Sequence, residues 1–117
     1  MAMTSNSVHI IQISGDAGLR AAQDIAGKLR QALASHDSVA VATEAIETAD
    51  ITTIQLLLAA RKQASASRKS LTLAAPPVGA LRELLVATGC LDAEGRPLTP
   101  DGDFWIPSTR QAKGKAA

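Results

Sequence analysis

The residues best placed to do chemistry lie in the stretch 50–55, where a polar turn runs into an apolar helical pattern. Thr52 and Gln55 are three residues apart, which is typical of a capping box, where each side chain satisfies a free backbone donor at a helix start. Asp50 adds a carboxylate beside the positive end of the helix dipole. A phosphate at Thr52 or Thr53 would gain the same backbone donors. The stretch is therefore either a plain helix cap or a site built around a phosphate.

Other patterns that carry catalysis or metal binding are missing from the sequence. It has no glycine-rich phosphate loop followed by lysine, no Gly-x-Ser-x-Gly and no Cys-x-x-Cys. His9 is typical of a strand residue, and His36 of a favourable charge near a helix C-terminus. Cys90 is the single cysteine, which excludes an internal disulfide and fits a reducing cytoplasm. We therefore expect no enzyme activity, no cofactor and no metal site.

Length and composition predict one folded domain outside the membrane. The 117 residues suffice for one core, and 46% of them are hydrophobic. Aromatic residues make up only 2%, so the core must consist of Ala, Leu, Ile and Val. A net charge of +1 argues against nucleic acid as a partner. Neither a secretory signal nor an apolar run of about 20 residues is present, so a cytoplasmic protein without membrane insertion is expected.

Strand and helix patterns alternate along the chain. Short apolar, β-branched runs predict strands at 8–13, 38–43 and 70–75. Apolar residues at spacings of three and four predict helices at 18–35, at about 51–65 and from 76 to 88, with Gly89 ending the last one. The segment 43–49, which carries Glu44 and Glu47, is expected to be a loop. This order favours an α/β domain with a largely parallel sheet covered by helices.

The apolar residues of the helical patterns define the expected core. The inner faces are predicted to include Leu19 in the first helix, Ile51 in the second and Val78 in the third. Four cations gather at the C-terminal end of the second helix, at positions 61, 62, 68 and 69. The helix dipole favours cations there, and a phosphate- or nucleic-acid-binding patch is the alternative.

The two ends of the chain differ in character from the middle. Residues 1–6 are polar and are predicted to be disordered, the domain is predicted to span 7–91, and 92–117 form a C-terminal extension with a loose basic tail. Phe104 and Trp105 are the only aromatic residues of the FWY type in the chain. We expect them in a short edge strand that completes the core, and the alternative is that they bind a partner.

The order of these segments resembles the STAS domain, the family of bacterial anti-sigma-factor antagonists and their relatives. The likeness covers roughly residues 8–91 and depends on order and spacing. It is carried by Ile-Ser-Gly-Asp at 13–16, Asp-Ile-Thr-Thr-Ile-Gln-Leu-Leu-Leu at 50–58, Leu-Thr-Leu-Ala-Ala-Pro at 71–76, Leu-Arg-Glu-Leu-Leu at 81–85 and Thr-Gly-Cys-Leu at 88–91. The resemblance implies a mixed, largely parallel sheet of about four strands, flanked by three to four helices and without catalysis.

The resemblance also implies a phosphorylation switch, from which this chain departs. In regulatory members a Ser or Thr after the helix-start aspartate is phosphorylated by a partner kinase, and the phosphorylated domain lets go. The aspartate matches Asp50, but Ile51 occupies the usual acceptor position and Thr53 replaces a common glycine. Either Thr52, with Thr53 as the neighbouring candidate, has taken over as acceptor, or the domain binds its partner without a switch.

Three functional readings follow. The first is a protein-interaction module in bacterial signalling, of the anti-sigma or chemotaxis kind, whose partner-binding residues are Glu44, Glu47, Asp50, Ile51, Thr52 and Thr53. The second is an accessory subunit that binds the ATPase of a lipid-transport ABC complex. The third is a small-ligand or nucleotide site at Thr52, which Arg61 is too far along the helix to assist, at about 13 Å. A homodimer is compatible with all three.

Overall fold

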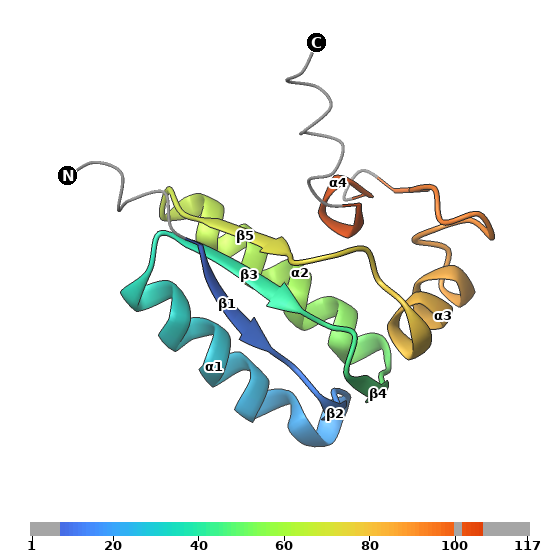
Figure 1. Ribbon diagram of the computed structural model, residues 1–117, viewed down its shortest axis with the longest axis horizontal. Helices are drawn as coiled ribbons and strands as arrows, with labels where there is room; N and C mark the ends of the chain where they lie inside the picture. The colour runs from blue at the N-terminus through green and yellow to red at the C-terminus, as the bar shows by residue number, and fades with distance from the viewer. Residues whose placement is uncertain (1–7, 100–101, 107–117) are drawn as a thin grey trace, which may run out of the picture.

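Two sets of parallel strands form the framework of the computed structural model, which describes residues 8–99 and 102–106. The main sheet has the order β1-β3-β5, with β1 at His9–Gln12, β3 at Ser38–Ala42 and β5 at Ser70–Leu73. Beyond its carboxyl edge, β2 (Gly15–Asp16) pairs in parallel with β4 (Ile46–Thr48), as Figure 1 shows. The predicted α/β fold with parallel strands is confirmed.

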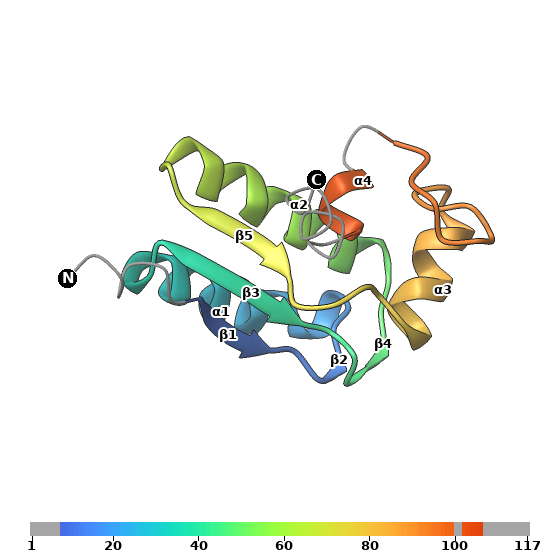
Figure 2. The same ribbon diagram turned by 45° about the horizontal axis from the view of Figure 1, so that its top comes forward.

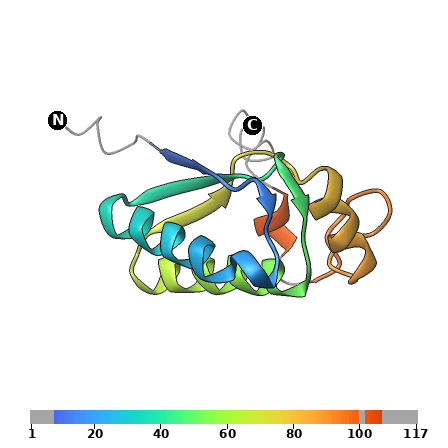
Figure 3. The same ribbon diagram turned by 90° about the horizontal axis from the view of Figure 1, so that it is seen from below.

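Helices cover one face of the main sheet. A short 3-10 helix, η2 (Leu19–Ala21), leads into α1 (Ala22–Ser35), and α1 lies beside α2 (Ile51–Ala66) under the strands (Figure 3). Because each helix connects two parallel strands, both start at the carboxyl edge of the sheet and run back beneath it. α3 (Gly79–Ala87) packs against β4. No helix within 8–99 or 102–106 is long and apolar enough to cross a membrane.

The core lies between the sheet and α1 and α2. Alternate strand residues point into it, so Val39 and Val41 of β3 and Leu71 and Leu73 of β5 are buried. The largest fully enclosed side chains include Leu29, Leu57, Leu81, Leu85 and Trp105. Gly89 ends α3 in the left-handed region with φ of 83°, as its type and position predict. The chain then turns so that Leu91 packs back onto the core.

Two segments differ from the prediction. The stretch 43–49 is not a plain loop, since Ile46–Thr48 forms β4 opposite β2. The aromatic pair does not form an edge strand either, because Gly102–Trp105 is a single helical turn, α4, beside β5 and α2 (Figure 2). Phe104 and Trp105 are 3% and 0% exposed, so they complete the core and are not free to bind a partner.

An ion pair holds α4 against α2. The Arg61 guanidinium donates to both carboxylate oxygens of Asp103, at 3.2 and 3.0 Å, and lies 5.4 Å from the centroid of the Phe104 ring. The Phe104 and Trp105 rings meet edge to face at 4.9 Å between centroids. Arg61 thus helps to close the core and is not available as a phosphate ligand.

Candidate functional site

The predicted site residues gather where the carboxyl edge of the sheet meets the starts of two helices. Residues 16–19 connect β2 to η2, and residues 48–53 connect β4 to α2, so the two loops lie side by side. We call these two segments together the Asp50 rim. Glu44 and Glu47 lie just outside it, in the turn before β4 and in β4, and both are exposed.

A single carboxylate, that of Asp50, caps two helix starts. Its Oδ1 accepts a hydrogen bond from the N–H of Thr52 at 2.9 Å, and its Oδ2 accepts one from the N–H of Leu19 at 3.0 Å. The N–H of Asp50 in turn donates to Thr53 Oγ1 at 3.0 Å. The capping box therefore consists of Asp50 and Thr53, and the prediction of Thr52 with Gln55 is wrong by two residues.

Thr53 is used entirely for structure. Its hydroxyl accepts from the Asp50 N–H and donates to the carbonyl oxygen of Ala17 at 2.7 Å, and the residue is 2% exposed. A kinase would have to unfold the start of α2 to reach it. Thr52, which is half-buried, is therefore the more accessible of the two candidate phosphoacceptors.

Asp16, Gly18 and Thr48 complete the rim, and the sequence did not point to them as site residues. Asp16 Oδ1 accepts from the N–H of Gly18 at 2.9 Å and from the hydroxyl of Thr48 at 3.0 Å. Gly18 is buried against the Asp50 carboxylate, so closely that a Cβ there would lie 2.5 Å from Oδ2. The only sequence signal for this arrangement is the turn pattern at Ser14-Gly15-Asp16.

The rim depends on the ionised form of Asp50. Hydrogen bonds from the Leu19 N–H and then from the Thr52 N–H and hydroxyl hold the pKa of Asp50 below its ordinary value of 3.8, although partial burial opposes the shift. The pKa of Asp92 is lowered by the N–H groups of Arg96 and Glu94, and that of Asp103 by the Arg61 guanidinium. All three carboxylates are therefore better stabilised as anions in the folded chain.

This gives a prediction for acid stability. Groups with lowered pKa values contribute stability above the pKa of the unfolded chain, which is lost as the pH falls through the folded value. We expect the thermal midpoint to be flat from about pH 7 to about pH 5 and to fall below about pH 4. Differential scanning calorimetry measures it. Asp50→Asn should lower the thermal midpoint at neutral pH and reduce its dependence on pH in the acid range. An unchanged pH dependence would mean that the ionised Asp50 carboxylate does not contribute to acid stability.

Two apolar side chains of the rim are exposed, although the sequence pattern predicted that they would be buried. Leu19 is 71% exposed and Ile51 is 51% exposed, although both were expected on inner helix faces. Each is the first residue of its helix, and the two helix starts are joined by the Asp50 carboxylate. Val78, which precedes α3 as its N-cap residue, was also expected on an inner face and is 48% exposed.

The rim offers little to a phosphate or a metal ion. The N–H groups of Thr52 and Thr53 already donate to Asp50, to Oδ1 and to the main-chain oxygen respectively. A phosphate at this helix start would have to displace a carboxylate of the same charge. Within the part of the chain that the structure describes, no group of three or more His, Cys, Asp or Glu side chains could hold a metal ion.

Comparison with known proteins shows the family of this chain. A family model described as "Mlab, STAS domain" matches residues 2–98. The match spans most of the chain, which therefore belongs to this STAS-domain family. Domains of this kind are generally non-catalytic regulatory modules. A search of the curated proteins gave no match. Family membership confirms the resemblance seen in the order of the sequence segments.

Proposed function

We propose that the chain is a non-catalytic, cytoplasmic protein-interaction module in bacterial signalling, which binds a partner kinase or regulator through the Asp50 rim. The observation that carries this proposal is the exposure of Leu19 and Ile51 on either side of the Asp50 carboxylate. Single exposed apolar side chains are common, but these two begin helices that the Asp50 carboxylate joins, and such a pair suits burial against another protein.

The physical properties of the rim suit protein docking. Burying a leucine or isoleucine side chain is worth about 1.5–3 kcal/mol each, enough for two anchors of an interface. The hydrogen bonds of Asp50 and Thr53 fix the backbone from which both anchors project, so little ordering is needed on binding. Glu44 and Glu47 add exposed carboxylates beside the anchors and would favour a basic rim on the partner.

A second candidate is a partner that stays bound without a phosphorylation switch, such as the ATPase of a lipid-transport ABC complex. Ile51 favours it, since this side chain stands at the usual acceptor position and cannot be phosphorylated. A phosphate on Thr52 would lie beside Asp50, whose charge it would repel. Incubation with ATP and the cognate kinase separates the candidates, because only a switch adds the mass of a phosphate to the intact chain.

The docking proposal predicts that two substitutions in the rim weaken binding of the partner protein. Ile51→Glu and Thr52→Glu place a charge at the centre of the rim, and each should reduce capture of the partner at least about tenfold. The tagged 117-residue chain and each variant are used to capture proteins from the source cells, and quantitative mass spectrometry measures the amount of each captured protein. Leu98→Glu is the matched control, since Leu98 is 58% exposed in the loop after α3. A partner captured equally by all four proteins would refute the assignment of the rim.

A further inference from the structure

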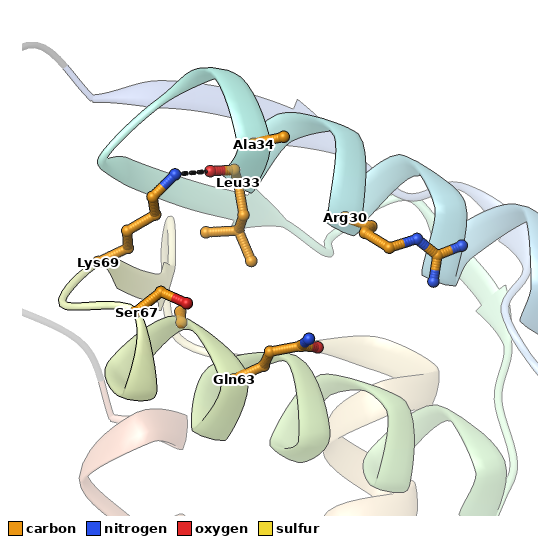
Figure 4. Close-up of a pocket in the computed structure, with 7 residues that line it drawn as sticks. Arg30, Leu33, Ala34, Gln63, Ser67 and Lys69 are labelled. Atoms are coloured by element: carbon orange, nitrogen blue, oxygen red, sulfur yellow. Dashed lines mark hydrogen bonds between the residues drawn. The ribbon is translucent and has the colours of Figure 1, made fainter.

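A groove between α1 and α2 lies on the side of these helices that faces away from the sheet. It consists of two adjoining hollows that share Arg30, Leu33 and Gln63. The first hollow continues toward Lys69, and the second toward the starts of the helices. Figure 4 shows the end near Lys69, with Leu33 and Gln63 on opposite walls. From position 26 to position 34 along α1 the groove is about 12 Å long, which is the length of two helical turns.

The walls of this α1–α2 groove are mostly small and apolar. They are formed by Ala26, Leu29, Leu33 and Ala34 on α1 and by Leu56, Ala59, Ala60 and Ala64 on α2. Alanine side chains keep the walls low, so another helix can approach both backbones closely. The groove is open along its length, since Ala34, Ala59 and Gln63 are exposed. An open groove between two helices suits a third helix better than a flexible acyl chain, which needs enclosure.

The polar residues of the groove determine the charge of its occupant. The described residues that line it include two cations, Arg30 and Lys69, and no carboxylate. Lys69 is engaged, because its ammonium donates to the carbonyl oxygen of Leu33 at the end of α1. Arg30 is exposed and makes no salt bridge or side-chain hydrogen bond with any residue in 8–99 or 102–106. Its guanidinium is therefore available to a carboxylate from outside.

We propose that the α1–α2 groove docks an acidic amphipathic helix of a partner protein, with the apolar face of that helix on the alanines and a carboxylate on Arg30. Two other occupants have the wrong charge. The C-terminal residues 107–117 contain Arg110, Lys113 and Lys115 and no acidic side chain. A second copy that paired groove to groove around a two-fold axis would bring Arg30 and Lys69 against the same two cations. This site lies outside the Asp50 rim and goes beyond the proposed function.

Selection from a phage library of helical peptides against the 117-residue chain tests the proposal. We expect enriched peptides to be amphipathic and acidic on one side. Measured by fluorescence anisotropy of a synthesised peptide, Arg30→Glu should weaken binding about tenfold by reversing the attraction. Gln63→Trp, which fills the groove, should weaken it about as much. Both substituted residues are exposed, and circular dichroism shows whether the variants fold.

Lys28→Glu is the matched control. Lys28 is also exposed on α1, two residues before Arg30, but it lines a different hollow beside β1. Its substitution should change the affinity less than about twofold, because an exposed charge outside the interface contributes little. Ile51→Glu should also leave peptide binding unchanged, so a failure of the Asp50 rim and a failure of the groove are distinguishable.

Several outcomes would overturn the proposal. An acidic helix in the groove would be excluded if no peptide is enriched above background or if the enriched peptides are basic. It would also be excluded if Lys28→Glu and Arg30→Glu lose the same affinity for the peptide. Sedimentation equilibrium, which measures the oligomeric state, provides a further test. A dimer of the wild-type chain that is lost in Gln63→Trp would identify a second copy as the occupant instead.

Discussion

Replacing Trp105 by alanine is expected to lower the free energy of unfolding by about 3–5 kcal/mol, the usual cost of truncating a buried aromatic side chain. Trp105 is 0% exposed and packs edge to face on Phe104. In a chain with few aromatic residues, no neighbouring large ring is free to fill the space. Equilibrium denaturation in guanidinium chloride, followed by circular dichroism, measures the change. A loss below about 1 kcal/mol would mean that α4 contributes little to the core.

Trp105→Phe tests the cause of that loss. The indole Nε1–H of Trp105 is buried and has no hydrogen-bond partner among the residues that the structure describes. A buried unpaired donor costs about 1–3 kcal/mol, so phenylalanine removes this cost while it keeps most of the packing. We expect Trp105→Phe to lose less than half as much stability as Trp105→Ala. Equal losses would show that the N–H forms a hydrogen bond that stabilises the fold.

The long segments of this fold could be predicted from the sequence because their patterns are local. Fourteen residues of α1 and sixteen of α2 repeat apolar positions often enough to identify a helix. The β-branched runs of β1 and β3 are equally clear. The predicted ends of α2, β1 and β3 agree with the structure within about two residues, which is the usual uncertainty of a helix or strand boundary. The helix predicted from 18 begins as the 3-10 helix η2 and becomes α-helical only at Ala22, and the one predicted from 76 begins at Gly79.

The short segments could not be predicted because long-range contacts define them. β2 has two residues and β4 has three, and each is a strand only because the other lies beside it. α4 is a single turn, and a turn of four residues has too little helical pattern to be recognised. The ion pair between Arg61 and Asp103 joins residues 42 positions apart in the sequence. The sequence indicated that Phe104 and Trp105 complete the core, but it did not indicate that they do so in a helical turn.

The helix cap at Asp50 could be predicted from its residue types, but its hydrogen-bond geometry could not. Asp50 and two threonines at a helix start indicated a cap, and the cap exists. The sequence did not show that Asp50 also binds the Leu19 N–H, since a residue 31 positions away comes close only in the folded chain. Periodicity places Leu19 and Ile51 on inner helix faces, but both are exposed as the first residues of their helices. Burial in α2 begins two residues later, at Thr53 and Ile54.

Gly18→Ala should destabilise the chain by about 1–3 kcal/mol, the usual cost of overpacking a buried position. The added Cβ would lie 2.5 Å from Asp50 Oδ2 and 2.9 Å from Asp50 Cγ, so the carboxylate must move away from the Leu19 N–H. The backbone of Gly18 has φ of −90°, which alanine adopts without strain, so the clash alone accounts for the loss. Thermal and chemical denaturation of the variant measure the effect.

Gly27→Ala is the matched control for this prediction. Gly27 lies within α1, and a Cβ there meets nothing within 4 Å, so alanine should stabilise the chain by about 0.5–1 kcal/mol through its higher helix propensity. The opposite signs expected for the two substitutions separate the contact with Asp50 from the general effect of replacing glycine.

A double-mutant cycle shows whether Gly18 acts through Asp50. In an Asp50→Ala background the carboxylate is gone, so Gly18→Ala should cost nothing or become slightly stabilising, by up to about 1 kcal/mol, because alanine restricts the unfolded chain. Additive effects of the two substitutions would mean that the loop 16–19 packs independently of Asp50. Strong coupling would mean that one carboxylate sets the position of both helix starts, and with them the spacing of Leu19 and Ile51 as docking anchors.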